Sequence, residues 1–175
     1  MPERPVPFSL LDAARVVARG GTFDSKLAAL TEQARSVSDA GPVAVLLHDA
    51  DGDVLLSLDG ELALPMAAAD ADTTRAVADR EPLILGHLPE SLAGLLPEAA
   101  SSMLAPLVVE DEDGAFIEGL LAIGWSSHEP PVEEVPDAVL AIADLAAVTI
   151  RQARLRNSVW EQSDHADRLS HTDRL

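Results

Sequence analysis

The sequence contains no cysteine among its 175 residues. Thiol catalysis, cysteine-ligated zinc and thioether-attached chromophores are therefore excluded, and the absence of disulfides is typical of a cytoplasmic protein. Tyrosine is also absent, and aromatic residues make up only 3% of the chain. With so few rings the chain has no base-stacking surface, and its core must be built from Leu, Val, Ile and Ala.

Basic residues are scarce as well: 12 Lys and Arg face 30 Asp and Glu, which gives a formal net charge of −18. Such a field repels phosphate backbones and anionic membrane surfaces, so we expect neither nucleic acid nor a membrane as a partner. No apolar run approaches the length of a membrane span, and the N-terminus MPERPVPFSLL lacks the basic-then-apolar order of a signal peptide. These features predict a cytoplasmic location.

Hydrophobic periodicity predicts two helices at the start of the chain. Apolar residues recur at helical spacing in FSLLDAARVVARGG, so residues 1–22 are predicted to hold an N-terminal helix that ends at Gly20. The second helix is predicted to begin after Thr22, a candidate N-cap, and to end at Gly41.

Two hairpins are predicted from alternating apolar runs around Asp-Gly turns. The first has strands near 43–48 and 53–58 in PVAVLLHDADGDVLLSLDG, and the second has strands at 103–109 and 115–125 in SSMLAPLVVEDEDGAFIEGLLAIGW. The acidic run at 49–53 is interpreted as a turn and not as a calcium loop, because it lacks the later bidentate Glu. No metal site is predicted.

The segments between the hairpins are predicted to be mainly helical. Residues 61–81 are Ala-rich, with a break at Pro65, and PESLAGLLPEA is predicted to be a short helix that Pro89 opens. PLILG is predicted to be a short strand. From residue 137 to 175 the chain has no Gly or Pro and keeps helical spacing throughout, which predicts a helix of about 60 Å.

This order of elements predicts an α+β domain with a central antiparallel sheet, helices on both faces and a long C-terminal signalling helix. The order and three stretches within it resemble the GAF domain family. VAVLLHDADGDVLL looks like the first hairpin of that family, SMLAPLVVEDEDGAFIEGLLAIGWSS like its later strand pair, and VPDAVLAIADLAAVTIRQARL is similar to its closing helix. We assign residues 23–150 to the GAF domain and residues 151–175 to a coiled-coil linker helix toward an output domain.

The C-terminal stretch RLSHTDRL resembles the linker that enters GGDEF diguanylate cyclase domains, where a His-Thr-Asp-x-Leu run leads into the catalytic domain. The resemblance implies that the chain is the N-terminal sensory part of a longer protein of cyclic di-GMP signalling. The alternative output is a histidine kinase, although Thr172 and the residues after it do not fit the Glu-Leu-Arg-x-Pro that should follow Ser-His there. This chain carries no cyclase signature, so we expect it to be non-catalytic.

An apolar stripe along the predicted long helix indicates a homodimer. Its members are spaced alternately three and four residues apart, as in a coiled-coil seam: Leu145, Val148, Gln152, Leu155, Val159, Gln162, Ala166 and Leu169. We expect Leu145 and Val148 to pack on the sheet of their own chain. Beyond Leu155 the helix has no sheet to cover, which favours a parallel coiled coil with a second copy.

The family resemblance implies a small-molecule pocket between the sheet and the middle helices. Five residues are candidates to line it: His48, Met66, His87, Met103 and Trp125. Bilin attachment and the free methionine sulfoxide reductase activity of the family both use cysteine and are excluded. The cyclic-nucleotide motif requires an Asn-Lys pair, and the only Asn here is Asn157. No cofactor is required; haem stays open because it needs a single axial His, such as His87.

Three functions therefore remain for the isolated sequence. The preferred one is a sensory GAF domain that dimerises and controls a cyclase in cis, with a small-molecule ligand as its input. The others are a ligand-free dimerisation scaffold and a haem-bound sensor.

Overall fold

The computed structural model describes residues 21–172, except for the side chains of residues 159–161, 163–165, 167 and 170–172. Six antiparallel strands form one sheet in the order β3-β2-β1-β6-β5-β4. The long strands β1 (Val43–Asp49), β5 (Ser101–Asp111) and β6 (Gly114–Trp125) occupy its centre. The predicted α+β class is confirmed. The predicted helix within residues 1–22 lies almost wholly outside the described residues.

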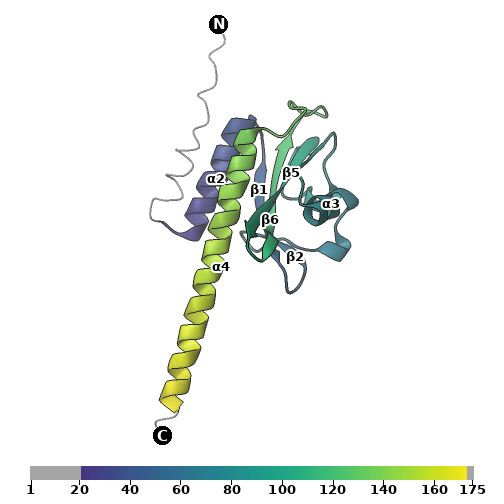
Figure 1. The fold of residues 1–175 in the computed structure, drawn as a ribbon. Coiled ribbons are helices and arrows are strands. Elements are labelled where there is room, and N and C mark those ends of the chain that lie inside the picture. The colour runs from purple at the N-terminus through teal and green to yellow at the C-terminus, as the bar shows by residue number, and fades with distance from the viewer. Residues whose placement is uncertain (1–20, 173–175) are drawn as a thin grey trace.

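Helices cover both faces of the sheet, as the sequence predicts. Helices α2 (Phe23–Ser38) and α4 (Asp137–Thr172) lie side by side on one face, and α3 (Ala71–Asp79) lies on the other (Figure 1). Thr22 caps α2, because its hydroxyl accepts a hydrogen bond from Ser25 N at 3.2 Å.

The alternation of strand side chains produces two apolar clusters, one on each face. We call the first the helix-side cluster: Leu27, Leu30, Ala34, Val45, Met103, Ala105, Leu107, Leu121, Ile123, Trp125, Val139, Ile142, Ala143, Ala146, Ala147 and Ile150. We call the second the α3-side cluster: Leu46, Leu55, Leu64, Met66, Ala76, Val77, Leu85, Leu92, Leu96, Leu104, Leu120 and Ala122.

Both predicted hairpins are confirmed. Strand β1 pairs with β2 (Val54–Ser57) through the turn at residues 50–53, and Asp51 N donates to Asp49 Oδ1 at 3.2 Å within that turn. The second hairpin joins β5 to β6, with Asp111 paired to Gly114. Gly114 has a φ of 128°, a left-handed value that favours glycine over other residues at this position.

The middle of the chain differs from the prediction of a mainly helical segment. Residues Ala63–Pro65 form β3, which pairs with β2 at the edge of the sheet, and a single 3₁₀ turn, η1 (Met66–Ala68), follows. Proline is tolerated in an edge strand because the missing N–H faces outward. The predicted short helix after Pro89 is only a 3₁₀ turn, η2 (Glu90–Leu92). The predicted strand in PLILG is confirmed as β4 (Leu83–Leu85).

The predicted long helix is confirmed as one continuous helix of 36 residues, α4. Its first part packs beside α2, and its C-terminal part projects beyond the domain (Figure 1). Among the described helices, α4 included, none combines the length and the apolar character that crossing a membrane requires.

Asp70 caps α3, and we expect Asp70→Ala to lower the free energy of unfolding by about 1 kcal/mol at pH 7. Its carboxylate accepts hydrogen bonds from Thr73 N at 2.8 Å and from Thr73 Oγ1 at 2.9 Å. Burial, the largest single influence, raises the pKa of Asp70, but hydrogen bonds from Thr73 and Ser91 together outweigh it and hold this pKa below 3.8. Urea unfolding at several pH values measures the effect.

Because the pKa of Asp70 is lower in the folded state, the stability it contributes is present above the unfolded value of 3.8 and is lost as the pH falls through the folded value. The matched variant Asp70→Asn keeps a good cap but cannot titrate. It should therefore retain most of the stability at pH 7 and lose part of the pH dependence. Equal stability of wild type and Asp70→Ala at pH 7 would contradict the capping role.

Candidate functional site

The sheet separates three of the predicted pocket residues. Met66 belongs to the α3-side cluster, whereas Met103 and Trp125 belong to the helix-side cluster. Trp125 Nε1 donates to Ser38 O at 3.1 Å and so ties the end of β6 to the end of α2. Met66 therefore lies on the face where a ligand is predicted, and Met103 and Trp125 pack beneath α2 and α4.

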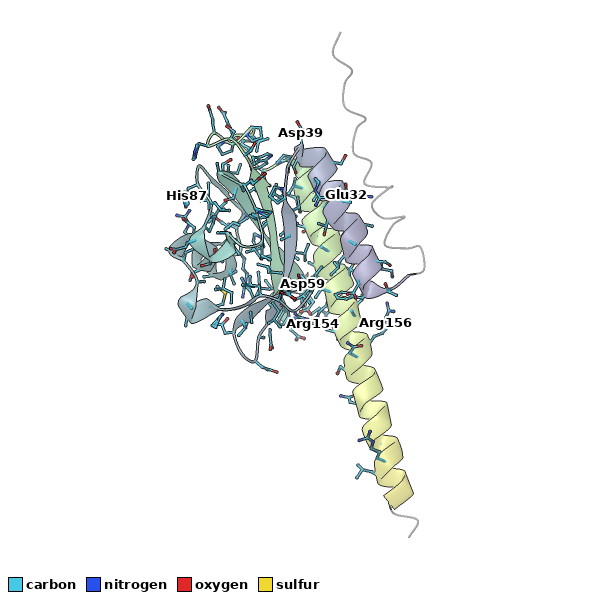
Figure 2. All side chains as sticks on the ribbon, turned by 180° about the vertical axis from the view of Figure 1, so that it is seen from behind. Glu32, Asp39, Asp59, His87, Arg154 and Arg156 are labelled. Carbon is cyan, nitrogen blue, oxygen red and sulfur yellow. The ribbon has the colours of Figure 1, made fainter. Side chains whose placement is uncertain are left out.

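The two candidate histidines, His48 and His87, belong to neither of the two apolar clusters. His48 is buried at the end of β1, where its Nε2 lies 3.0 Å from Asp53 Oδ1. The His87 side chain is 58% exposed, and its Nε2 lies 2.8 Å from Asp72 Oδ2 at the start of α3. Figure 2 shows His87 on the side of the domain away from α4. Because Asp72 holds the ring nitrogen at an exposed position, His87 does not suit an axial haem ligand.

Packed apolar side chains lie between the sheet and α3. Ala76, Leu92 and Leu96 are each 0% exposed there and lie against the strands. The segment before β5 packs closely on β6, since a Cβ at Gly124 would lie 2.7 Å from Ala99 Cβ. These side chains therefore form a packed hydrophobic cluster between the sheet and α3.

A β-bulge in β6 turns one carboxylate toward the helices. Leu107 pairs with Gly119 but Val108 pairs with Ile117, so Glu118 is an extra residue in β6. In a regular strand, side chains two residues apart point to the same face, so Glu118 would share the face of Leu120, which packs on the α3 side. The bulge instead places Glu118 against α4, where it is 1% exposed.

Two arginines of α4 hold this buried carboxylate, and we call Glu118, Arg151 and Arg154 the Glu118 clasp. Arg151 Nη1 donates to Glu118 Oε1 at 3.2 Å, and Arg154 Nη1 lies 2.9 Å from Glu118 Oε2. Oε2 accepts no aligned hydrogen bond from the described residues, so the second contact is an ion pair. Arg151 also lies 3.6 Å from Asp111 Oδ2 and 4.7 Å from the centre of the Phe116 ring.

The clasp lies where α4 leaves the sheet. Ile150 is the last residue of α4 in the helix-side cluster; Arg151 follows it directly, and Arg154 lies about one turn further on. Arg154 donates through Nη2 to His48 O and, at 3.5 Å, to Glu118 O, so its guanidinium bridges β1 and β6. Figure 2 shows Arg154 at the lower end of the sheet, beside the projecting part of α4. The clasp therefore joins α4 to β1 and β6 at the point where the helix leaves the sheet.

The prediction that Val148 packs on the sheet is wrong, because its side chain is 41% exposed. Successive residues of an α-helix are rotated by about 100°, which places Val148 opposite the buried Val139 and Ile150. The corresponding prediction for Leu145 is confirmed, since it is partly buried against the helix-side cluster.

The remaining seam residues lie along the same outward face of α4. Leu155 is 54% exposed and Leu169 is 56% exposed, and Gln152, Gln162 and Ala166 are exposed as well. The side chain of Val159 lies outside the described residues. The dimer itself stays a prediction.

Comparison with solved structures shows which fold this arrangement belongs to. The GAF domain of a phosphoenolpyruvate-protein phosphotransferase from Coxiella burnetii superposes with a TM-score of 0.69 at 16% identity, over 85% of this chain and 94% of that one. The chain has the GAF fold. A phycocyanobilin-bound GAF domain from a cyanobacterial phytochrome gives a TM-score of 0.62 at 20% identity, over 86% and 98% of the two chains. A methyl-accepting chemotaxis protein, residues 122 to 287, gives 0.64 at 19% identity, over 82% and 96%.

The likeness to other GAF structures lies in the fold and not in the residues. No family model matches this sequence, and neither does any curated protein. Among the side chains that the structure describes, no group of three or more His, Asp or Glu residues is placed to hold a metal ion.

Sequence reasoning missed the Glu118 clasp, although a signal for it exists. Glu118 is a single acidic residue inside the apolar run AFIEGLLAIGW, and a charge in a buried strand needs a partner. Arg151 and Arg154 are spaced by three, so they share a face of a helix. The long distance in sequence between β6 and α4 conceals the pairing.

Proposed function

We propose that this GAF domain is a sensory and regulatory, non-catalytic module that forms a homodimer through α4 and controls a C-terminal output domain in a cytoplasmic signalling protein. The observation that carries this proposal is the outward apolar stripe of α4. Val148 and Leu155 are exposed apolar side chains of α4, and the stripe continues to Leu169 beyond the domain. A second copy would bury these side chains in a parallel coiled coil.

The output domain that we propose is a diguanylate cyclase, on the basis of the linker-like stretch RLSHTDRL. Two cyclase domains must face each other to join two nucleotides, so their relative orientation controls the rate. A two-helix connector passes a small rotation or register shift from one domain to the next. The Glu118 clasp supports this role, because it joins α4 to β1 and β6 at the point of exit.

The double variant Leu155→Glu, Leu169→Glu tests the dimer. Four charges brought together along the seam repel each other and are costly to bury, so light scattering should give the mass of a monomer for the variant and of a dimer for the wild type. Asn157→Glu, which adds charge on the opposite face of α4, should remain a dimer. A double variant that stays dimeric would place the interface elsewhere. In a protein that includes a cyclase domain, the double variant should also lose most cyclic di-GMP synthesis.

A ligand-free dimerisation scaffold is the second candidate, and the filled α3-side cluster favours it. Leu92, Leu96 and Ala76 are fully buried on the face of the sheet where the family resemblance predicts a small molecule. Native mass spectrometry distinguishes the two candidates. A dimer without additional mass supports the scaffold, whereas a bound mass supports a ligand-controlled sensor.

A further inference from the structure

An apolar cleft of about 300 Å³ lies on the inward side of α4, next to the Glu118 clasp. Its floor is formed by Phe23 of α2, Leu47 of β1, and Ile150 and Ala153 of α4. This volume lies at the lower end of the range for small-molecule sites. The cleft is on the opposite face of the sheet from the space beneath α3.

Two arginines and an amide surround this apolar floor. Arg154, Arg156 and Asn157 complete the lining, and they come from a single turn of α4. Figure 2 shows Arg154 and Arg156 at the level where α4 leaves the domain. An apolar cleft with a few convergent polar groups has the usual character of a ligand site.

The charged residues that line the cleft are both arginines, Arg154 and Arg156, although the chain as a whole carries −18. Arg151 and Arg154 are balanced by Glu118 and Asp111 through the ion pairs of the clasp. Arg156 is exposed and has no hydrogen bond or ion pair with another described residue. An anion that reaches this cleft therefore finds a guanidinium that no described residue pairs.

We propose that this cleft binds a small anionic molecule with an apolar body, of the arylcarboxylate or arylsulfonate class. The body lies on Phe23, Leu47 and Ile150, and the anion is held by Arg156 and by the amide of Asn157. Such a molecule touches α2, β1 and α4 together, close to the clasp. This proposal goes beyond the function given above and does not depend on whether the chain dimerises.

The test is a fluorescence titration of the full chain with 8-anilinonaphthalene-1-sulfonate, an aromatic anion. Wild type should bind one molecule per chain with a saturable rise in emission. Arg156→Gln, at an exposed position that does not affect the core, should weaken binding at least threefold. Ala153→Trp fills the floor of the cleft and should abolish binding. Arg75→Gln on α3 removes a charge away from the cleft and should leave the affinity unchanged.

An uncharged probe separates the role of charge from that of the apolar floor. N-phenyl-1-naphthylamine should bind wild type and Arg156→Gln with equal affinity, and more weakly than the sulfonate binds wild type. Sulfonate binding by wild type should weaken at 1 M salt, because the Debye length there falls to about 3 Å. Non-saturable binding of the sulfonate, or an unchanged affinity in Arg156→Gln, would overturn the proposal.

Discussion

Replacing Arg151 and Arg154 together with alanine is expected to lower the free energy of unfolding by about 3–5 kcal/mol. The Glu118 carboxylate is 1% exposed, and these two side chains are its cationic partners. Without them a buried negative charge is left uncompensated, and its lost hydration has nothing to offset it. Urea unfolding at pH 7, followed by circular dichroism, measures the change.

The matched control removes the charge and keeps the shape. Adding Glu118→Gln to the double variant should restore most of the stability, because the buried group is then neutral and of the same size. Arg75→Ala should cost less than about 1 kcal/mol, since Arg75 forms an exposed pair with Asp72 at 3.9 Å. If the double variant unfolds at the same urea concentration as the wild type, the arginines of α4 are not needed to compensate the buried charge of Glu118.

This comparison also measures how firmly α4 is attached at its exit. Upstream of Ile150 the helix is held by apolar contacts on one whole face. Downstream of Arg154 it projects past the sheet (Figure 1). The Glu118 clasp lies at the boundary between these two parts of α4, where Arg151 and Arg154 contact β1 and β6.

The parts of the fold that depend on short-range patterns could be predicted from the sequence. The turns near Asp51 and Asp113 carry their own signals, and each hairpin needs only strands that are adjacent in the chain. The long helix could also be predicted from a local pattern, because the sequence after residue 137 contains no Gly or Pro that would end it.

The parts that depend on pairing between distant residues could not be predicted. The segment containing Pro65 is Ala-rich and locally favours a helix, but pairing with β2 makes it an edge strand. Val148 fits a helical stripe, yet the face that α4 buries is decided by the sheet and α2. The bulge at Glu118 is set by the register between β5 and β6, which the local sequence does not reveal.

Gly119→Ala is expected to lower the free energy of unfolding by about 3 kcal/mol or more, as a severe case of overpacking. A Cβ at this position would lie 2.1 Å from Leu46 O and 3.3 Å from Leu107 Cδ1. Leu46 O belongs to the backbone of β1, which pairs with β6 through Leu46–Leu120 and Leu47–Gly119. The clash therefore cannot be relieved by a side-chain rotation and must separate the two central strands.

The same substitution at Gly94 is the control for Gly119→Ala. No atom lies within 4 Å of a Cβ built on Gly94, and its backbone is not left-handed. Gly94→Ala should leave the stability unchanged or raise it by about 0.4–1 kcal/mol, because alanine restricts the unfolded chain. Thermal unfolding of both variants provides the measurement. A loss of less than about 1 kcal/mol for Gly119→Ala, a typical value for an ordinary substitution, would mean that β1 and β6 can separate at little cost. The bulge that directs Glu118 toward α4 would then lack a rigid frame.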